Sequence, residues 1–244
     1  TSLVVKAGKV LGEDVSEYEA LYENIVKAFR QTFTDYRTQT EMVLAVHFGL
    51  AEDLQKTADQ LAQKVKADGE KLQTGFVGTP YLLHVLSGYG HTELAYTLLL
   101  RTEYPSWLYP VTKGATTVWE HWDGIMENGD FWSTDMNSFN HYAYGAVADW
   151  VYEEAAGIKP AEPGFAKIRI APKPDARLEW LEASLETRQG LVRSAWSHIE
   201  ENGCRKVRYE IITPAPATLV IDGVEKEVQA GEYVFFTDEK GSCL

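Results

Sequence analysis

Aromatic, carboxylate and imidazole side chains gather in one part of the chain, between residues 74 and 150. Residues 119–123 read WEHWD, and residues 137–142 read NSFNHY. Sugar rings present apolar C–H faces that stack on aromatic planes, and their hydroxyls hydrogen-bond to carboxylates, amides and imidazoles. The two motifs supply both kinds of group, so their composition favours a carbohydrate-binding site.

The tryptophans of this stretch also admit a structural explanation. Five of the seven lie there, several in segments too rich in Gly, Pro, Asn and Asp for a helix interior: Trp107, Trp119, Trp122, Trp132 and Trp150. Indole side chains are nevertheless common in protein cores, and a Glu beside a Trp can be a buried ion-pair partner and no more. From residue types alone, a core and a sugar site both stay open.

The elements that would position these residues change in kind near residue 160. Before it, apolar residues recur at three- and four-residue steps, which predicts helices. The first has Ser16 as its cap, with Glu19 in the capping-box position, and buries a stripe from Tyr18 to Phe29. Further helices are expected at residues 39–49, 52–68, 78–88, 91–103 and 138–156, and their short connections imply antiparallel neighbours.

After Pro160 the pattern becomes alternating or β-branched, which predicts strands. They are expected at residues 167–170, 178–186, 191–198, 206–212, 218–221 and 233–236, with hairpin signals at Asn202-Gly203 and Asp222-Gly223. The chain is thus divided into a helical domain, residues 1–160, and an antiparallel β-sandwich, residues 161–244. We expect the sandwich to pack on the helices without contributing chemistry, with Trp180 and Trp196 in its core or interface.

The composition argues against several kinds of partner. A chain of 244 residues, 45% hydrophobic and 24% charged, is long enough to form two domains. Its net charge of −13 repels phosphate backbones and anionic membrane surfaces, and no Lys/Arg-rich stripe offers a local exception. No apolar run has the length of a membrane span. Neither nucleic acid nor a membrane is therefore expected as a partner.

No cofactor and no metal ion is expected either. Two cysteines are too few for a multi-cysteine metal site, and His121 and His141 form no tight ligand pattern with a third residue. Residue 1 is Thr and leads straight into a helical pattern, so we expect the original N-terminus to have been processed or cut away. No secretion signal is recognisable, which leaves the localisation open and slightly favours the cytoplasm.

Four motifs, taken in their order along the chain, resemble one known family. Residues 74–79 (TGFVGT), 104–109 (YPSWLY), 114–123 (GATTVWEHWD) and 137–145 (NSFNHYAYG) are similar to segments of bacterial α-L-rhamnosidases. The likeness continues through Pro163-Gly164-Phe165 into the strand-rich remainder, which looks like the C-terminal β-domain of that family. The resemblance implies an (α/α)6 barrel as catalytic domain and hydrolysis of terminal α-L-rhamnosyl linkages with inversion of configuration.

An inverting glycosidase needs a carboxylic acid that protonates the leaving oxygen and a carboxylate base that activates water, roughly 6.5–9.5 Å apart. The resemblance places the base on Glu120, which is the Glu of the family's Trp-Glu-x-Trp segment. It also places His141 in the sugar pocket, where an imidazole can hydrogen-bond a hydroxyl or orient the base. The alternative for His141 is a core histidine whose hydrogen bonds are satisfied locally.

The same resemblance extends the candidate site to aromatic and amide side chains. Of Trp119 and Trp122, one is expected to stack on the sugar while the other packs behind Glu120 and excludes water. Trp107 and Asn140 lie in matching motifs and complete the substrate-binding candidates. The implied partner is a rhamnosylated glycan or glycoside.

No residue of this sequence is assigned as the general acid. In the family it belongs to an Asp/Glu-rich segment in the first half of the barrel, and nothing in this sequence matches that segment. Glu41 is better explained as a first-turn charge favoured by the helix dipole, and Asp123 as a residue that orients water or a turn. We therefore expect an α + β multidomain fragment: the second half of the (α/α)6 barrel followed by the β-sandwich, inactive by itself. Its uncovered helix faces favour a homo-oligomer.

Two other functions stay open. A noncatalytic carbohydrate-binding or structural module would keep the aromatics and need no base. Another six-hairpin enzyme, acting on a different sugar such as a uronic acid, would need Arg or Lys near the pocket to hold a carboxylate. Between Thr74 and Tyr152, Arg101 and Lys113 are the only basic side chains besides histidines, which favours a neutral sugar. The 6-deoxy position of rhamnose asks for an apolar wall, which aromatic residues can provide.

Overall fold

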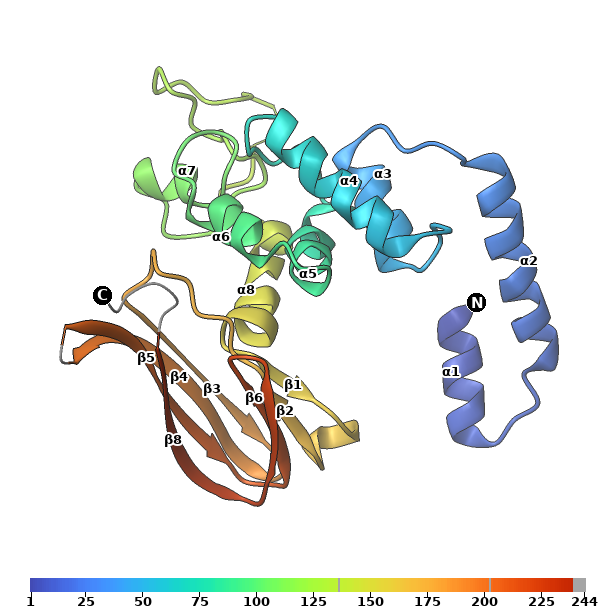
Figure 1. The fold of residues 1–244 in the computed structure, drawn as a ribbon. Coiled ribbons are helices and arrows are strands. Elements are labelled where there is room, and N and C mark those ends of the chain that lie inside the picture. The colour runs from blue at the N-terminus through green and yellow to red at the C-terminus, as the bar shows by residue number, and fades with distance from the viewer. Residues whose placement is uncertain (136, 202, 239–244) are drawn as a thin grey trace.

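The computed structural model describes residues 1–135, 137–201 and 203–238, and Figure 1 shows a helical region followed by a β-sandwich. The helical region contains α1 (Ser2–Leu11), α2 (Ser16–Thr32), α3 (Gln39–His47), α4 (Leu54–Ala67), α5 (Thr79–Gly88), α6 (Thr92–Leu100) and α7 (Leu108–Thr112). After a long irregular segment, a 3-10, an α and a π turn follow one another directly: η1 (Tyr142–Ala146), α8 (Val147–Trp150) and η2 (Val151–Ala155). Within the described residues, no helix combines the length and the apolar character that a membrane crossing requires.

Helices α3 to α6 and α8 surround one hydrophobic core. α3 contacts α4 and α5, and α5 also contacts α6 and α8, so two helical hairpins stand side by side. On α4 the buried residues recur at three- and four-residue steps along one face, as the sequence predicted: Ala58, Leu61, Ala62 and Val65. α3, α4, α5 and α6 all fall within their predicted ranges. Fully buried large side chains of this core include Leu61, Leu82, Leu86, Tyr96, Leu98 and Trp150.

The hairpin of α1 and α2 stands clear of that core in Figure 1. The predicted apolar stripe is present on α2, but Tyr18, Leu21 and Ile25 are 45–47% exposed, and no residue of either helix is buried. The expected burial is therefore wrong for this chain, because the described residues supply no helix that covers the stripe. The expected cap is wrong too: α2 begins at Ser16 itself, whose N–H donates to Asp14 Oδ1 at 3.0 Å.

The sandwich consists of two four-stranded sheets among the described residues. The first has the order β1-β2-β6-β7 and the second β3-β4-β5-β8. The strands are β1 (Ile158–Pro160), β2 (Ile168–Ile170), β3 (Trp180–Thr187), β4 (Gly190–Glu201), β5 (Cys204–Thr213), β6 (Ala217–Ile221), β7 (Val224–Val228) and β8 (Gly231–Asp238), and a short η3 (Pro163–Phe165) lies between β1 and β2. Pairing is antiparallel except between β2 and β6, which run parallel.

Burial inside the sandwich follows the strand alternation, with one correction to the sequence prediction. Trp196 is fully buried and pairs in register with Leu181, on the inner face. Trp180 pairs with Ser197 on the outer face and is 66% exposed, so its predicted place in the core or interface is wrong. The Asp222-Gly223 hairpin connects β6 and β7 as predicted, whereas Asn202 of the other predicted hairpin lies outside the described residues.

Gly157 marks the passage from helices to sandwich. Its φ is +77°, and a Cβ there would lie 2.1 Å from the carbonyl carbon of Ala171, so only glycine fits. η2 ends at Ala155, and β1 begins at Ile158, slightly before residue 160, where the sequence pattern changes. The indole of Trp196 donates to the carbonyl oxygen of Ala155 at 3.0 Å, which ties the sandwich core to the last helical turn.

Glu154 is a buried carboxylate at the same junction. Lys173 Nζ donates to its Oε2 at 2.6 Å, and Lys159 Nζ donates to its Oε1. Lys173 also donates to the carbonyl oxygen of Ser87 on α5 at 3.1 Å. Two ammonium groups thus compensate the cost of removing this carboxylate from water, and the pairing joins α5, η2 and the loop after β2.

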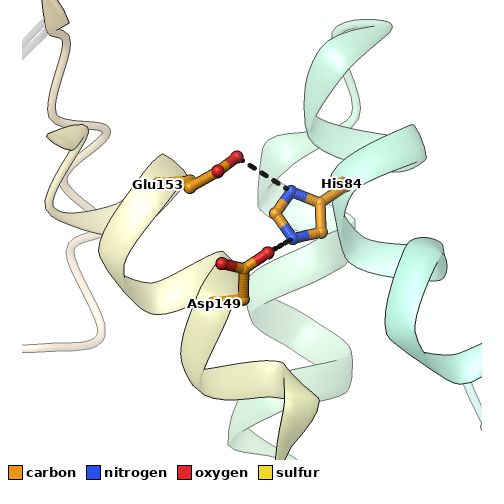
Figure 2. A group of neighbouring side chains, drawn as sticks. All are labelled: His84, Asp149 and Glu153. Carbon is orange, nitrogen blue, oxygen red and sulfur yellow. Dashed lines mark ion pairs between the residues drawn. The ribbon is translucent and has the colours of Figure 1, made fainter. Parts of the chain in front are cut away.

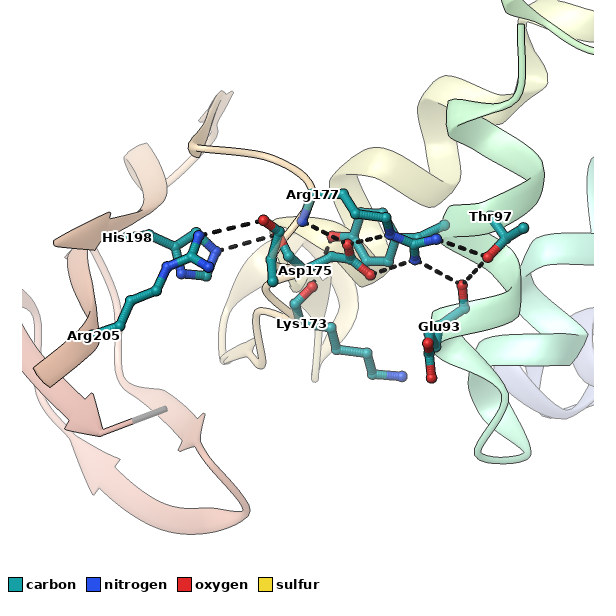
Figure 3. A network of polar contacts seen from close by, with 9 residues as sticks. Glu93, Thr97, Lys173, Asp175, Arg177, His198 and Arg205 are labelled. Atoms are coloured by element: carbon teal, nitrogen blue, oxygen red, sulfur yellow. Dashed lines mark hydrogen bonds and ion pairs between the residues drawn. The ribbon is translucent and has the colours of Figure 1, made fainter. Parts of the chain in front are cut away.

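A second polar network holds the loop before β3 against α6, as Figure 3 shows. The guanidinium of Arg177 donates to both carboxylate oxygens of Asp175 at 2.6–2.7 Å. It also donates to the carbonyl oxygen of Glu93 at 2.9 Å and to Thr97 Oγ1 at 2.8 Å. The ring of His198 on β4 lies 3.2 Å from the carbonyl oxygen of Asp175. The sandwich is therefore docked on the helices by polar contacts as well as by its core.

Candidate active site

The candidate site is built on two extended segments that lie side by side. The N–H of Glu120 donates to the carbonyl oxygen of Ser138 at 2.9 Å, and the N–H of His141 donates to that of Val118 at 2.8 Å. The predicted helix at 138–156 is therefore wrong in its first turn and begins only at Tyr142. The backbone of residues 138–141 pairs with residues 118–120 instead of forming helical hydrogen bonds.

Glu120 is held at its carboxylate as well as at its backbone. The N–H of Ser138 donates to Glu120 Oε2 at 3.1 Å, and the side chain is half-buried. Within the described part of the chain, no hydrogen bond to Oε1 accompanies it. One oxygen is thus oriented by the protein, while the other can accept a proton from a water molecule.

His141 stacks face to face on Phe76, with ring centroids 5.0 Å apart and planes 8° from parallel. Its Nδ1 is buried and has no hydrogen-bond partner among the described residues. The same is true of Asn137 Oδ1, although Asn137 Nδ2 donates to the carbonyl oxygen of Gly124 at 2.8 Å. A buried polar atom without a partner costs about 1–3 kcal/mol. Both atoms belong to residues 137–141, next to the backbone pairing that holds Glu120.

A group of aromatic side chains lies beside the stacked rings of His141 and Phe76. Trp122 stacks on Tyr144 at 3.8 Å between centroids and 15° between planes, and Trp107 meets Trp122 edge to face at 5.5 Å. Trp107 Nε1 donates to the carbonyl oxygen of Tyr144 at 2.9 Å. Burial raises the pKa of the Tyr144 phenol, and the charge of Glu120 is among the causes that raise it further. Tyr144 is therefore a neutral phenol that stacks on Trp122.

Trp119 and Asn140 occupy different positions from the rest of the predicted set. Trp119 is only 5% exposed and packs edge to face on Phe139 at 5.0 Å, so it supports the loop that carries Glu120. A Cβ at Gly124 would come within 3.1 Å of both rings, which shows how tightly this loop is packed. Asn140 is exposed, and its N–H donates to Ser138 Oγ at 3.3 Å.

Three residues that contact the candidate site were not predicted from the sequence: Phe76, Ser138 and Tyr144. All three lie in motifs that carried the family resemblance, but no role was assigned to them. Phe76, placed between Gly75 and Gly78 on a loop, had a signal of its own, because an exposed loop aromatic needs an explanation. The roles of Ser138 and Tyr144 depend on contacts with residues 18 to 37 positions away, which a local pattern does not reveal.

An apolar hollow of about 720 Å³ lies between the η1–α8–η2 helix and the sandwich. Val118, Tyr142, Ala146, Asp149, Tyr152 and Leu185 are among its lining residues. Glu120 is not, so the hollow is separate from the carboxylate although Val118 and Tyr142 belong to the same loops. The chemistry available at Glu120 is that of a fixed carboxylate with an imidazole and stacked aromatic rings nearby.

Comparison with known families matches both regions of the chain. Residues 1–155 match the bacterial alpha-L-rhamnosidase 6 hairpin glycosidase domain, and residues 157–234 match the bacterial alpha-L-rhamnosidase C-terminal domain. These matches confirm the predicted fold class and the resemblance seen in the sequence motifs.

Individual relatives agree with the family match. An α-L-rhamnosidase of Formosa agariphila is 39% identical over 231 residues, which cover 90% of this chain and 24% of the relative. One of Streptomyces avermitilis is 41% identical over 202 residues, which cover 80% of this chain and 20% of the relative. The chain thus spans about a quarter of the length of the curated relatives it matches or less.

Solved structures give the same result in three dimensions. The crystal structure of Streptomyces avermitilis α-L-rhamnosidase complexed with L-rhamnose matches with a TM-score of 0.88 and 33% identity, covering 97% of this chain and 26% of that one. The α-L-rhamnosidase from Aspergillus terreus matches with a TM-score of 0.85 and 32% identity, covering 98% of this chain and 29% of that one.

Proposed function

The chain belongs to the bacterial α-L-rhamnosidase family, and from this premise we propose that it is the C-terminal part of an inverting α-L-rhamnosidase whose general base is Glu120. The observation that carries the proposal is the fixed orientation of the Glu120 carboxylate. Glu120 accepts a hydrogen bond from the N–H of Ser138, which lies on the same segment as His141. A base must hold one orientation to take a proton from water during attack on the anomeric carbon.

The proposed reaction divides its tasks between Glu120 and a second carboxyl group. The free oxygen of Glu120 takes a proton from a water molecule, whose oxygen attacks the anomeric carbon on the face opposite the leaving group. An α-L-rhamnoside then gives β-L-rhamnose. The acid that protonates the leaving oxygen is assigned to another part of a longer polypeptide, about 6.5–9.5 Å from Glu120.

The sugar is proposed to lie against His141 and the aromatic group. The half-buried imidazole of His141 suits a sugar hydroxyl, and its stacking on Phe76 fixes the ring. Trp122, Trp107 and the exposed Asn140 complete the proposed contacts, with Trp119 supporting from behind. An apolar, aromatic surface suits the 6-deoxy methyl group, and the scarcity of Arg and Lys in this region disfavours a uronic acid.

A substrate panel tests this function on a polypeptide of the relatives' length that contains this chain. We expect hydrolysis of 4-nitrophenyl α-L-rhamnoside at least about 100-fold faster than of 4-nitrophenyl β-D-glucuronide, because Arg101 and Lys113 are the only Lys or Arg residues between Thr74 and Tyr152 that could hold a carboxylate. Equal or greater activity on the glucuronide would support an enzyme for uronic acids. Binding of rhamnose without hydrolysis of any aryl glycoside would support a noncatalytic module.

The 244 residues alone provide a second arm of the test. Without a general acid, they are expected to leave a natural rhamnoside disaccharide unhydrolysed, because losing one member of an acid–base pair costs several orders of magnitude. An aryl rhamnoside with a good leaving group needs little acid help, so weak turnover of that substrate is compatible with the proposal. Full activity on the disaccharide would show that the acid lies within residues 1–244.

A further inference from the structure

A histidine and two carboxylates meet outside the candidate active site, as Figure 2 shows. His84 comes from α5, Asp149 from α8 and Glu153 from η2. One ring nitrogen of His84 and one oxygen from each carboxylate lie within 4.8 Å of one another. None of the three residues contacts Glu120 or His141 through a hydrogen bond or stacking interaction found among the described residues. The group therefore has no part in the chemistry proposed above.

The geometry of His84 differs from that of an ordinary hydrogen-bonded pair. Its Nε2 lies 3.2 Å from Asp149 Oδ2, yet Nε2 is buried and has no hydrogen-bond partner among the described residues. The oxygen is thus close to the nitrogen but away from the direction of its N–H or lone pair. Zinc holds each ligand atom at about 2.0–2.1 Å with near-tetrahedral angles. Two ligand atoms on one zinc ion are therefore roughly 3.3 Å apart, and neither points directly at the other.

Glu153 completes the group from the next turn of the helix. Asp149 and Glu153 are four residues apart, so both carboxylates point toward α5 from one face. Glu153 Oε2 lies 3.9 Å from His84 Nδ1, whereas Asp149 faces Nε2, so binding one ion at Nε2 requires the Glu153 carboxylate to rotate toward Asp149. Behind the group, Trp150 Nε1 donates to Ser87 Oγ at 2.9 Å, which fixes α8 against α5. The three side chains therefore project from a rigid support.

The positively charged side chains near His84, Asp149 and Glu153 do not prevent a cation from binding there. Lys159 Nζ lies 3.7 Å from Glu153 Oε2, but it also donates to the buried Glu154 and so keeps a partner if Glu153 turns away. Burial lowers the pKa of His47, and the charge of His84 lowers it further, so His47 adds little positive charge nearby. Asp149 is 69% exposed and borders the apolar hollow, which gives an ion and a water molecule access.

We propose that His84, Asp149 and Glu153 bind one divalent transition-metal ion, with zinc as the best fit. One imidazole and two carboxylates suit zinc and its first-row neighbours, whereas calcium and magnesium prefer oxygen ligands alone. Three protein ligands leave a fourth position for water on the side of the hollow. The bound ion connects α5 to α8, immediately after the segment that holds His141, and so stabilises the helical region.

The test measures zinc binding to the purified 244-residue chain after dialysis against a chelator. Titration calorimetry with ZnCl2 is expected to give one saturable site, and thermal unfolding is expected to shift upward with zinc. His84→Ala and Asp149→Asn should each weaken binding by at least about tenfold, because each removes a ligand. Asp149 is largely exposed, so its substitution leaves the fold intact, which circular dichroism checks. Cobalt(II) absorption gives a second readout of the coordination geometry.

A matched control is available in the chain. His91 Nε2 contacts Asp59 Oδ1 at 2.8 Å on the helical surface, an ordinary pair without a second carboxylate. His91→Ala should leave zinc affinity unchanged. Absence of a saturable site, or equal loss of affinity in the His84 and His91 variants, would overturn the proposal and leave the group as a histidine paired with two carboxylates. The result is independent of hydrolytic activity, so it stands or falls separately from the proposed function.

Discussion

Glu120 and Ser138 are joined twice, once through their backbones and once through the carboxylate. The N–H of Glu120 donates to the carbonyl oxygen of Ser138 at 2.9 Å, and the N–H of Ser138 donates to Glu120 Oε2 at 3.1 Å. The hydroxyl of Ser138 takes no part in either contact. The orientation of the proposed base therefore depends on one backbone amide from a segment 18 residues further along the chain.

Removing that amide gives the first prediction. In a family-length polypeptide, Ser138→Pro should lower kcat by about tenfold or more with little change in KM, because the N–H that orients the base is lost while sugar contacts remain. Ser138→Ala keeps the amide and should retain near-normal kcat. Steady-state kinetics on an aryl α-L-rhamnoside measures both. If the proline variant is folded by circular dichroism and fully active, the clamp has no role in catalysis.

The second prediction concerns His141 and its stacking partner. His141→Ala should lower kcat/KM by about 10- to 100-fold, because a hydrogen bond to a sugar hydroxyl is lost. Phe76→Leu keeps an apolar contact but removes the stacked ring, so a smaller loss of a few fold is expected. An L-rhamnose titration that gives equal affinity for both variants and the unchanged protein would remove His141 from the sugar site.

The third prediction is a stability change at the junction. Glu154→Gln should lower the free energy of unfolding by about 2–4 kcal/mol at pH 7, because Lys159 and Lys173 lose a buried ionic partner. Urea denaturation measures the change. Glu182→Gln is the control: its pair with Arg193 lies on the outer sheet surface, where loss should cost less than about 1 kcal/mol.

The same carboxylate predicts a pH dependence. Burial by itself raises the pKa of Glu154, but hydrogen bonds and charges from Lys159 and Lys173 outweigh it and hold the pKa below its ordinary value of 4.5. A pKa that is lower in the folded than in the unfolded state contributes stability above about pH 4.5, which is lost as pH falls through the folded pKa. The difference between the Glu154→Gln variant and the unchanged chain should therefore shrink below that pH. A constant difference down to pH 3 would contradict the pairing.

Helices and strands could be predicted from the sequence where buried apolar residues recur at regular intervals. α4 and most strands appeared near their predicted positions because apolar residues repeat along one face. β7 escaped prediction because its sequence, VEKEV, places four of five residues at the surface of an edge strand. The start of the 138–156 helix was misplaced because Ser138 and His141 pair with residues 118–120, a contact that helical periodicity does not encode. Trp180 was misplaced because residue type alone does not tell which sheet face it occupies.

The fourth prediction follows from the uncovered stripe on α2. The isolated chain should self-associate, because Tyr18, Leu21 and Ile25 present apolar surface to water. Sedimentation velocity at several concentrations measures this. Leu21→Lys with Ile25→Lys should shift the chain toward monomer, whereas Ala20→Lys with Asn24→Lys, which adds the same charge on the neighbouring face, should not. A chain that stays monomeric at high concentration would show that the stripe needs no partner.

The central claim is that Glu120 activates the attacking nucleophile in an inverting reaction, and the configuration of the azide product tests it most directly. In a family-length polypeptide, Glu120→Ala should lower turnover of an aryl α-L-rhamnoside by about two to four orders of magnitude, while Glu127→Ala, an exposed carboxylate on the same loop, should not. Added azide needs no base, so it should restore turnover of the Glu120 variant. Proton NMR is expected to show β-L-rhamnosyl azide. An α-configured azide, or full hydrolysis by the Glu120 variant without azide, would contradict the assignment.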